Sequence, residues 1–427
     1  MSQPAWSPTG LAVPSRPPRR RVSALTIVTM AVLGLGTLAI AFLLLLSGGP
    51  VDAVITVFLA AVSFPLLIML CFWLDRYEPE PARYRIAALG WGAVIAVGIG
   101  LGLEALATLA GSSAVTTTVL WAPVAEEFGK GLFPLLILLL RRDQLHGILD
   151  GLVYALLAGI GFAFTEDILY YLQSLMQGGP GGLASTFIVR GVLSPFAHPL
   201  FTSATGVGIG IAVMSRSRVV RVLAPLLGYL VAVLLHAIWN GSATFGGTRG
   251  FFLTYLVAFL PLLLLLVVIG VWARRQEGKM LTRSLQDCAQ MGWVSPWEIR
   301  WVATLSDRVA ARKYAKAVGG KPAADILSAY QQALTEMAFL HNRVVSGTAP
   351  ADFNRRMYEI QQRAALLRPG VILPPAQPGP AFVGQGPPGG AALGPAPDQW
   401  SPIPGQALPP SGPYGSGSWP PPRGPAS

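Results

Sequence analysis

The sequence is poor in charged residues and in cysteine. Asp, Glu, Lys and Arg make up only 12% of its 427 residues, whereas soluble domains average about 25%. This deficit excludes an ordinary water-soluble enzyme. The two cysteines, Cys71 and Cys288, lie far apart in segments of different polarity, so we expect free thiols and no disulfide framework. Zinc-finger, phosphate-loop and RNA-binding signatures are also missing, and we predict no nucleic-acid partner.

Hydrophobic residues, in contrast, make up 52% of the chain and occur in long runs. A membrane-spanning helix needs about 20 apolar residues, and no run alternates as a strand of a membrane barrel would. We therefore predict an all-α fold: a polytopic transmembrane helix bundle of about eight spans in the lipid bilayer of the cell membrane. The predicted spans are roughly 23–46, 51–74, 86–110, 119–140, 147–173, 184–213, 222–245 and 252–273.

The basic residues between these segments predict the orientation of the chain. Short cytoplasmic loops carry an excess of Lys and Arg. With the N-terminus inside, the cytoplasmic loops contain ten arginines and the outer loops contain only Arg249. We therefore predict a multi-pass protein with both termini in the cytoplasm. A signal peptide would also begin with basic residues, but the first apolar run is too long for one.

Composition divides the chain into four regions. Residues 1–22 are polar and Pro-rich, 23–275 form the transmembrane domain, and 276–368 are predicted to form a small cytoplasmic helical domain. Its helices are expected at roughly 296–318, 322–345 and 351–367, the first beginning with the capping sequence Ser295-Pro296-Trp297-Glu298. Residues 369–427 contain 18 prolines and are predicted to be a disordered tail, either a plain flexible segment or a ligand for a Pro-binding partner.

Several ionisable side chains lie inside the predicted spans, where hydrocarbon penalises each by about 2.5 to 3.5 kcal/mol. At a rise of about 1.5 Å per residue, most of the acids and His236 fall about 10 to 13 Å below the outer surface. His198 falls deeper, unless the Ser194-Pro195 break makes its helix start later. An internal Glu126–Lys130 ion pair would explain only one span, so we predict one polar layer in the outer half of the membrane. Its members are Glu126, Glu127, Lys130, Glu166, Asp167, His198, His236 and Asn240, with Glu104 and Arg190 at its margin.

Carboxylates and two histidines in one wet cavity suit a divalent transition metal, zinc above all. Such an ion lowers the pKa of a bound water, and a nearby Glu can take the proton as general base. Glu126 and Glu127 point about 100° apart on a helix, so one could ligate or orient while the other acts on water. The implied chemistry is hydrolysis.

At this point the residues resemble a known family, the PrsW-type intramembrane proteases, which are related to the CAAX prenyl protease superfamily. The resemblance covers roughly residues 50–275. It rests on Asp75-Arg76-Tyr77-Glu78-Pro79-Glu80-Pro81, Glu126-Glu127-x-x-Lys130, Asp150-Gly151, Phe162-x-x-x-Glu166-Asp167, His198 and His236-x-x-x-Asn240.

The resemblance implies cleavage of membrane-anchored protein substrates, with a catalytic role for Glu126 and Glu127. It implies a metal-binding role for Glu166, His198 and His236. A mechanism without metal is also open, in which a Glu and a His activate water while His236 and Asn240 stabilise the oxyanion. Asp167 departs from the Asn of many related members and leaves the ligand set open.

Two other classes of function compete with a protease. Buried Glu, Lys and His also build the ion sites of transporters, although no duplicated half with broken helices is visible in the sequence. A non-enzymatic membrane scaffold could use the polar layer only to hold its helices together.

Overall fold

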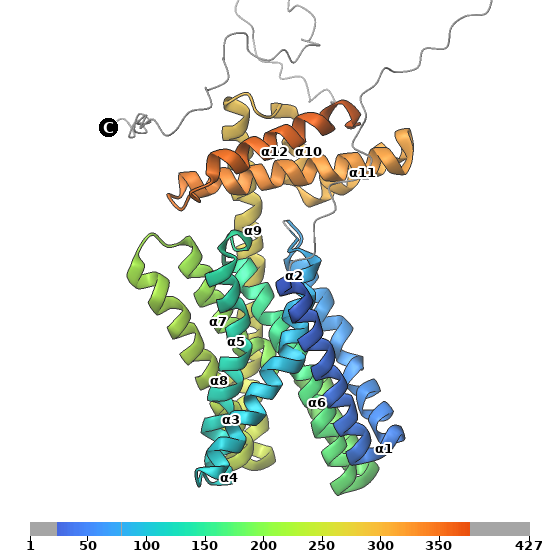
Figure 1. Cartoon of the computed structure of the whole chain (residues 1–427), viewed down its shortest axis with the longest axis vertical. Helices are drawn as coiled ribbons and strands as arrows, with labels where there is room; N and C mark the ends of the chain where they lie inside the picture. Colours follow the sequence, from blue (N-terminus) through green and yellow to red (C-terminus); the bar gives the residue numbers. More distant parts are fainter. Residues whose placement is uncertain (1–23, 78, 376–427) are drawn as a thin grey trace, which may run out of the picture. The chain divides into compact units, whose positions relative to one another are not determined.

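A computed structural model describes residues 24–77 and 79–375 of the chain (Figure 1). Within these ranges every regular element is a helix, which confirms the all-α class. The predicted N-terminal segment 1–22 and the tail beyond residue 375 lie outside the described residues. The α-helices are α1 (Ala24–Leu74), α2 (Ala82–Gly90), α3 (Val97–Leu109), α4 (Ala114–Thr116), α5 (Ala122–Leu140), α6 (Ile148–Phe187), α7 (Ala197–Met214), α8 (Arg218–Thr254), α9 (Leu260–Gln290), α10 (Arg300–Ala303), α11 (Leu305–Val345) and α12 (Phe353–Leu367).

Four helical stretches in the described part of the chain are long and apolar enough to cross a membrane. They are Thr29–Leu74, Ala82–Leu109, Ile148–Met214 and Arg218–Gln290. Helix α5 is not one of the four, and it is the helix that carries Glu126, Glu127 and Lys130. The count of eight spans therefore stays a prediction.

Inside three of these stretches a glycine with positive φ separates two helical pieces; the three are Gly49, Gly179 and Gly247. The hydroxyls of Ser174 and Thr186 lie 2.7 Å apart around Gly179, although twelve residues of straight helix would separate them by about 18 Å. Around Gly247, the rings of Trp239 and Phe251 have centroids 4.8 Å apart. The reversals at Gly179 and Gly247 fall between the predicted spans, in the segments 174–183 and 246–250. Glycine suits both positions, because only glycine adopts this backbone conformation without strain.

Helix α6 provides the core of the apolar part. Its residues from 149 to 163 are all buried. Glycines allow the neighbouring helices to approach it closely: a Cβ added to Gly206 of α7 would lie 2.5 Å from the carbonyl oxygen of Gly151. A Cβ added to Gly161 would lie 2.0 Å from the carbonyl oxygen of Leu89 in α2. Small residues thus bring backbones together, as expected where packing rather than the hydrophobic effect joins helices.

The break at Ser194-Pro195 is present in the structure. A π-helical segment ends at Leu193, and α7 begins at Ala197. His198 therefore stands in the first turn of α7. The helix that carries His198 thus starts late, and an uninterrupted helix through residues 184–213 is wrong.

The residues after 275 form a helical unit with its own core of apolar side chains. Helix α9 continues through residue 275 without a break, and its last turns contribute Leu281 and Leu285 to this core. The predicted helix 296–318 is corrected: a 3₁₀ turn at Pro296–Glu298 and the short α10 come first, and extended backbone at Thr304 separates them from α11. The expected capping box is present, since the Ser295 amide donates to Glu298.

The two remaining helices of this unit lie close to their predicted ranges. Gly320, with φ of 71°, interrupts α11 just before Pro322, so the chain has separate helical pieces on either side as predicted. Helix α12 covers most of the expected 351–367.

Candidate active site

Five helical segments bring polar side chains together inside the apolar part of the protein. Helix α5 contributes the acids and the lysine of its second and third turns, α6 an acidic pair, and the π-helical segment Ile188–Leu193 an arginine. Helices α7 and α8 contribute one histidine each. The side chains concerned are Glu126, Glu127, Lys130, Glu166, Asp167, Arg190, His198 and His236. The predicted polar layer is thus one contiguous cluster, which we call the Glu/His cluster.

The α5 residues form a buried ion-pair network. The Lys130 Nζ lies 2.7 Å from Glu127 Oε1 and 3.4 Å from Glu126 Oε2, and neither Lys130 nor Glu127 is exposed to solvent. The same Nζ lies 3.0 Å from His198 Nδ1. The Glu126–Lys130 pair, which the sequence left as an alternative explanation, exists but is part of a network that extends beyond one helix. An isolated, self-neutralising pair therefore does not describe the site.

Each histidine uses one ring nitrogen on a carboxylate and turns the other toward Glu126. His198 Nε2 lies 2.6 Å from Glu166 Oε2, and His236 Nδ1 lies 3.0 Å from Glu127 Oε1. The opposite nitrogens, His198 Nδ1 and His236 Nε2, are 3.9 and 3.8 Å from Glu126 Oε2. A carboxylate behind an imidazole fixes its tautomer and ring orientation, which is the usual outer partner of a metal-bound histidine.

Aromatic rings hold the two imidazoles. The His198 and His236 ring centroids are 5.1 Å apart at a steep angle, and the Phe201 ring stacks on His236 at 4.9 Å. Phe162, four residues before Glu166 on α6, packs against His198 at 5.1 Å. These apolar walls limit water access and thereby strengthen the electrostatic interactions in the cluster.

Arg190 is the charged partner of the acidic pair on α6. It forms ion pairs with both carboxylates, with its Nε 2.6 Å from Asp167 Oδ1 and its Nη2 on Glu166. Asp167 thus has a charged partner of its own, Arg190. Next to Asp167, Arg190 and His198 lies a cavity of about 10 Å³, at the lower limit of what holds one water molecule.

Asn240 lies apart from these contacts. Its Nδ2 donates a hydrogen bond of 2.9 Å to the carbonyl oxygen of Thr118, in the π-helical segment Thr117–Trp121 before α5. It shares a helix face with His236, as its spacing predicts, but its amide holds two segments together.

Sequence reasoning missed one member of the cluster. The Thr202 hydroxyl, one turn after His198, lies 2.9 Å from Glu127 Oε2 and is fully buried. A hydroxyl in a membrane helix costs little and often bonds to its own backbone, so Thr202 does not stand out in the sequence. The spacing of four residues from His198 was the available signal.

The residues present fit a divalent metal ion. Among the described residues, Glu126, His198 and His236 are all buried and offer three ligand atoms within 4.8 Å of one another. With neutral imidazoles, four carboxylates of the cluster face only Lys130 and Arg190, so negative charge remains for a cation to balance. Ligation by His198 requires the Lys130 ammonium to give up its contact with Nδ1; Lys130 would keep Glu127 as its partner.

Comparisons with known proteins agree with this geometry. Residues 80–266 match the family described as PrsW family intramembrane metalloprotease. Over 154 residues the chain is 27% identical to the Protease PrsW of Geobacillus kaustophilus (strain HTA426). That match covers 35% of this chain and 64% of the relative, less than two thirds of its length. No solved structure matches.

Both comparisons confirm the resemblance seen in the sequence motifs: over residues 80–266 the chain is similar to the PrsW-type proteases. Every residue of the Glu/His cluster lies within the matched range 80–266, whereas the helical unit after residue 275 lies outside it.

Proposed function

We propose that this protein is an intramembrane protease that hydrolyses peptide bonds of membrane-anchored proteins. The observation that carries the proposal is the convergence of two imidazoles on Glu126, each with a carboxylate on its other nitrogen. This arrangement lies among apolar helices, within the range that matches the intramembrane metalloprotease family.

We propose that Glu126, His198 and His236 are the metal ligands, and that the ion is zinc or another divalent metal. Such an ion supplies Lewis-acid polarisation and a water of lowered pKa. The sequence assigned the third ligand to Glu166 instead. In the structure Glu166 lies on the far nitrogen of His198 and pairs with Arg190, so we propose that it positions His198.

The other side chains have proposed roles in orientation and proton transfer. Glu127 is the proposed proton acceptor, and its carboxylate is held by Lys130, Thr202 and His236. The Lys130 ammonium, buried at the centre of the cluster, would stabilise negative charge that develops on the scissile carbonyl oxygen. The oxyanion role predicted for Asn240 stays a prediction, because it requires that amide to leave Thr118.

The membrane arrangement is also part of the proposal. We propose eight crossings with both termini in the cytoplasm, supported by the chain reversals at Gly179 and Gly247 and by the arginines of the predicted inner loops. The site would then stand in the outer half of the bilayer, where it meets the spanning segment of a substrate.

The test combines metal analysis with cleavage of a single-span substrate by the detergent-purified full chain. We expect stoichiometric metal and cleavage in the wild type, and loss of both in His236→Ala. Glu127→Gln should keep its metal and lose at least about a hundredfold in rate, the usual contribution of a general base. His341→Ala is the matched control, because His341 contacts Asp287 in the helical unit and should change neither readout.

Other results would redirect the proposal. Cleavage without bound metal that still depends on Glu126 would favour the all-protein mechanism. Full activity in both Glu127→Gln and His236→Ala would refute the site. Absence of both metal and cleavage in a folded wild type would favour a transporter or a scaffold.

A further inference from the structure

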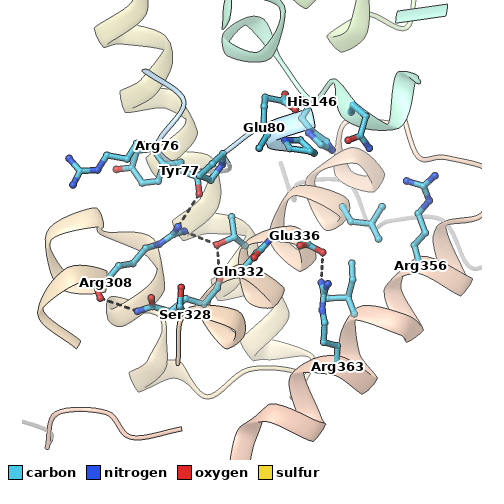
Figure 2. Close-up of a pocket in the computed structure, with 18 of the residues that line it drawn as sticks. Arg76, Tyr77, Glu80, His146, Arg308, Ser328, Gln332, Glu336, Arg356 and Arg363 are labelled. Atoms are coloured by element: carbon cyan, nitrogen blue, oxygen red, sulfur yellow. Dashed lines mark hydrogen bonds and ion pairs between the residues drawn. The ribbon is translucent and has the colours of Figure 1, made fainter. Parts of the chain in front are cut away.

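A large cavity lies between the loop after α1 and the helical unit after residue 275. Its volume is about 1060 Å³, and it is lined by the segments around 76–85 and 141–146 together with α11 and α12. Figure 2 shows Arg76 from the loop and Arg308, Arg356 and Arg363 from α11 and α12 around this space. The cavity belongs to neither the Glu/His cluster nor the apolar core.

Its lining is strongly basic. Among the described residues, ten arginines and only three glutamates line it. The two further acids of the same loops in the sequence, Glu78 and Asp143, would leave the balance positive. A concave surface with one sign of charge concentrates ions of the opposite sign.

Several of these arginines form hydrogen bonds or ion pairs within the protein. Arg308 donates to the carbonyl of Tyr77 and to the Thr335 hydroxyl, and Arg363 pairs with Glu336. These two arginines therefore hold the helical unit together and against the loop. Arg355 and Arg356 share Asp352.

The described lining also contains three arginines without such ion pairs: Arg76, Arg83 and Arg312. Within the described part of the chain, none of the three has an acidic partner. Arg76 comes from the loop and Arg312 from α11, and both line the cavity. The pKa of Arg312 is lowered, first by burial and then by the charge of Arg76. Facing like charges are unfavourable unless an anion lies between them.

The two terminal segments outside the described residues carry little negative charge. Residues 1–23 contain no Asp or Glu, and residues 376–427 contain only Asp398. Because the lining stays positive even when Glu78 and Asp143 are counted, the cavity favours an anion from outside the chain.

We propose that this cavity is a binding site for a phosphate-bearing ligand that bridges the loop and the helical unit. Arginine forks match phosphate oxygens in two-point hydrogen bonds, and several of them suit more than one phosphate charge. The volume is that of a small-molecule site. Two sources carry this chemistry: a lipid headgroup, since the loop directly follows the apolar α1, and a soluble polyphosphate or nucleotide.

The site combines the family region with an added unit. Glu80 and Arg85 lie within the matched range 80–266, whereas Arg312 and Arg356 lie outside it. Binding would therefore tie the added helical unit to the loop that enters α2, and it does not depend on the proposed peptidase activity.

The test is thermal unfolding and calorimetric titration of the full chain in neutral detergent, with inorganic pyrophosphate as the soluble probe. The lipid arm compares nanodiscs of phosphatidylcholine alone with nanodiscs that also contain phosphatidylglycerol. The variants are Arg312→Gln and Arg76→Gln, singly and together. Arg283→Gln is the matched control, because Arg283 is exposed on α9 and does not line the cavity.

We expect the probe to raise the unfolding midpoint of the wild type and of Arg283→Gln, and the dissociation constant to weaken about tenfold for each cavity arginine removed. Without ligand, Arg312→Gln should be as stable as the wild type or more stable, because a repulsion is relieved. A merely structural role would instead lower the midpoint with and without ligand.

Each outcome decides the proposal. A response to pyrophosphate identifies a soluble ligand, and a response only to phosphatidylglycerol identifies a lipid headgroup, provided that Arg76→Gln and Arg312→Gln reduce it. No response to either probe, or a response that the double variant leaves unchanged, overturns the proposal.

Discussion

Replacing Lys130 by Met should destabilise the metal-free protein strongly. The ammonium is fully buried and contacts Glu126, Glu127 and His198. At 2.7 Å and an effective dielectric constant of about 20, the attraction between Lys130 and Glu127 alone is roughly 6 kcal/mol before desolvation. Loss of one partner from a buried pair typically costs about 3 to 5 kcal/mol, because the other charge stays buried and uncompensated.

The assay is thermal unfolding of the purified variant followed by tryptophan fluorescence, first with a chelator and then with added zinc. We expect a large loss of stability with the chelator. Zinc should recover much of it, since a divalent cation can replace the missing positive charge among the same carboxylates. Lys279→Met, at an exposed position of α9, is the matched control.

The reasoning about Lys130 would be refuted by a metal-free variant as stable as the wild type. Such a result would mean that the carboxylates of the cluster are not held charged against the ammonium. A variant that is destabilised but is not stabilised by zinc would support the ion-pair network and refute the proposed metal site.

Two further predictions concern packing and pH. Gly161→Ala should lower the free energy of unfolding by at least about 1 to 3 kcal/mol, because its Cβ would meet the Leu89 carbonyl oxygen at 2.0 Å. The control Gly102→Ala has nothing within 4 Å of its added Cβ and should be neutral or stabilising. Equal unfolding midpoints of the two variants would contradict the close approach at Gly161. Burial and the neighbouring Glu298 raise the pKa of Tyr330. Its contribution to stability should therefore be complete below the unfolded pKa of about 10 and be lost as the pH rises further. Tyr330→Phe should weaken that alkaline loss in circular dichroism, and an unchanged pH profile would disprove it.

The sequence identified most of the Glu/His cluster because the membrane environment makes each ionisable residue conspicuous. Glu126, Glu127, Glu166, His198 and His236 stand out in apolar runs, and the helical rise placed them at compatible levels. The break at Ser194-Pro195 was likewise visible, because proline disrupts the preceding helix. Thr202 escaped notice, since a hydroxyl carries no comparable penalty.

The boundaries of the helical unit were harder to predict. The capping sequence at Ser295 marked a helix start correctly, but the break at Thr304 has no glycine or proline to announce it. The core of the unit decides it, because Trp301 and Val302 must be buried at the same time as Ala311 and Leu334. The sequence does not reveal the cavity either, since its arginines come from two groups of segments, 76–141 and 308–363, that are distant in the chain.

By itself, then, the sequence determined the helical class, the apolar stretches and the residue types of the site, because hydrophobicity, helix periodicity and the cost of buried charge are local properties of the chain. Tertiary structure decided which atoms face one another. It placed Glu166 behind His198 and Glu126 between the two histidines, it paired Asp167 with Arg190, and it tied Asn240 to Thr118. These choices depend on how far each helix rotates when glycines let it pack against α6, and that rotation is set by all the packed helices together.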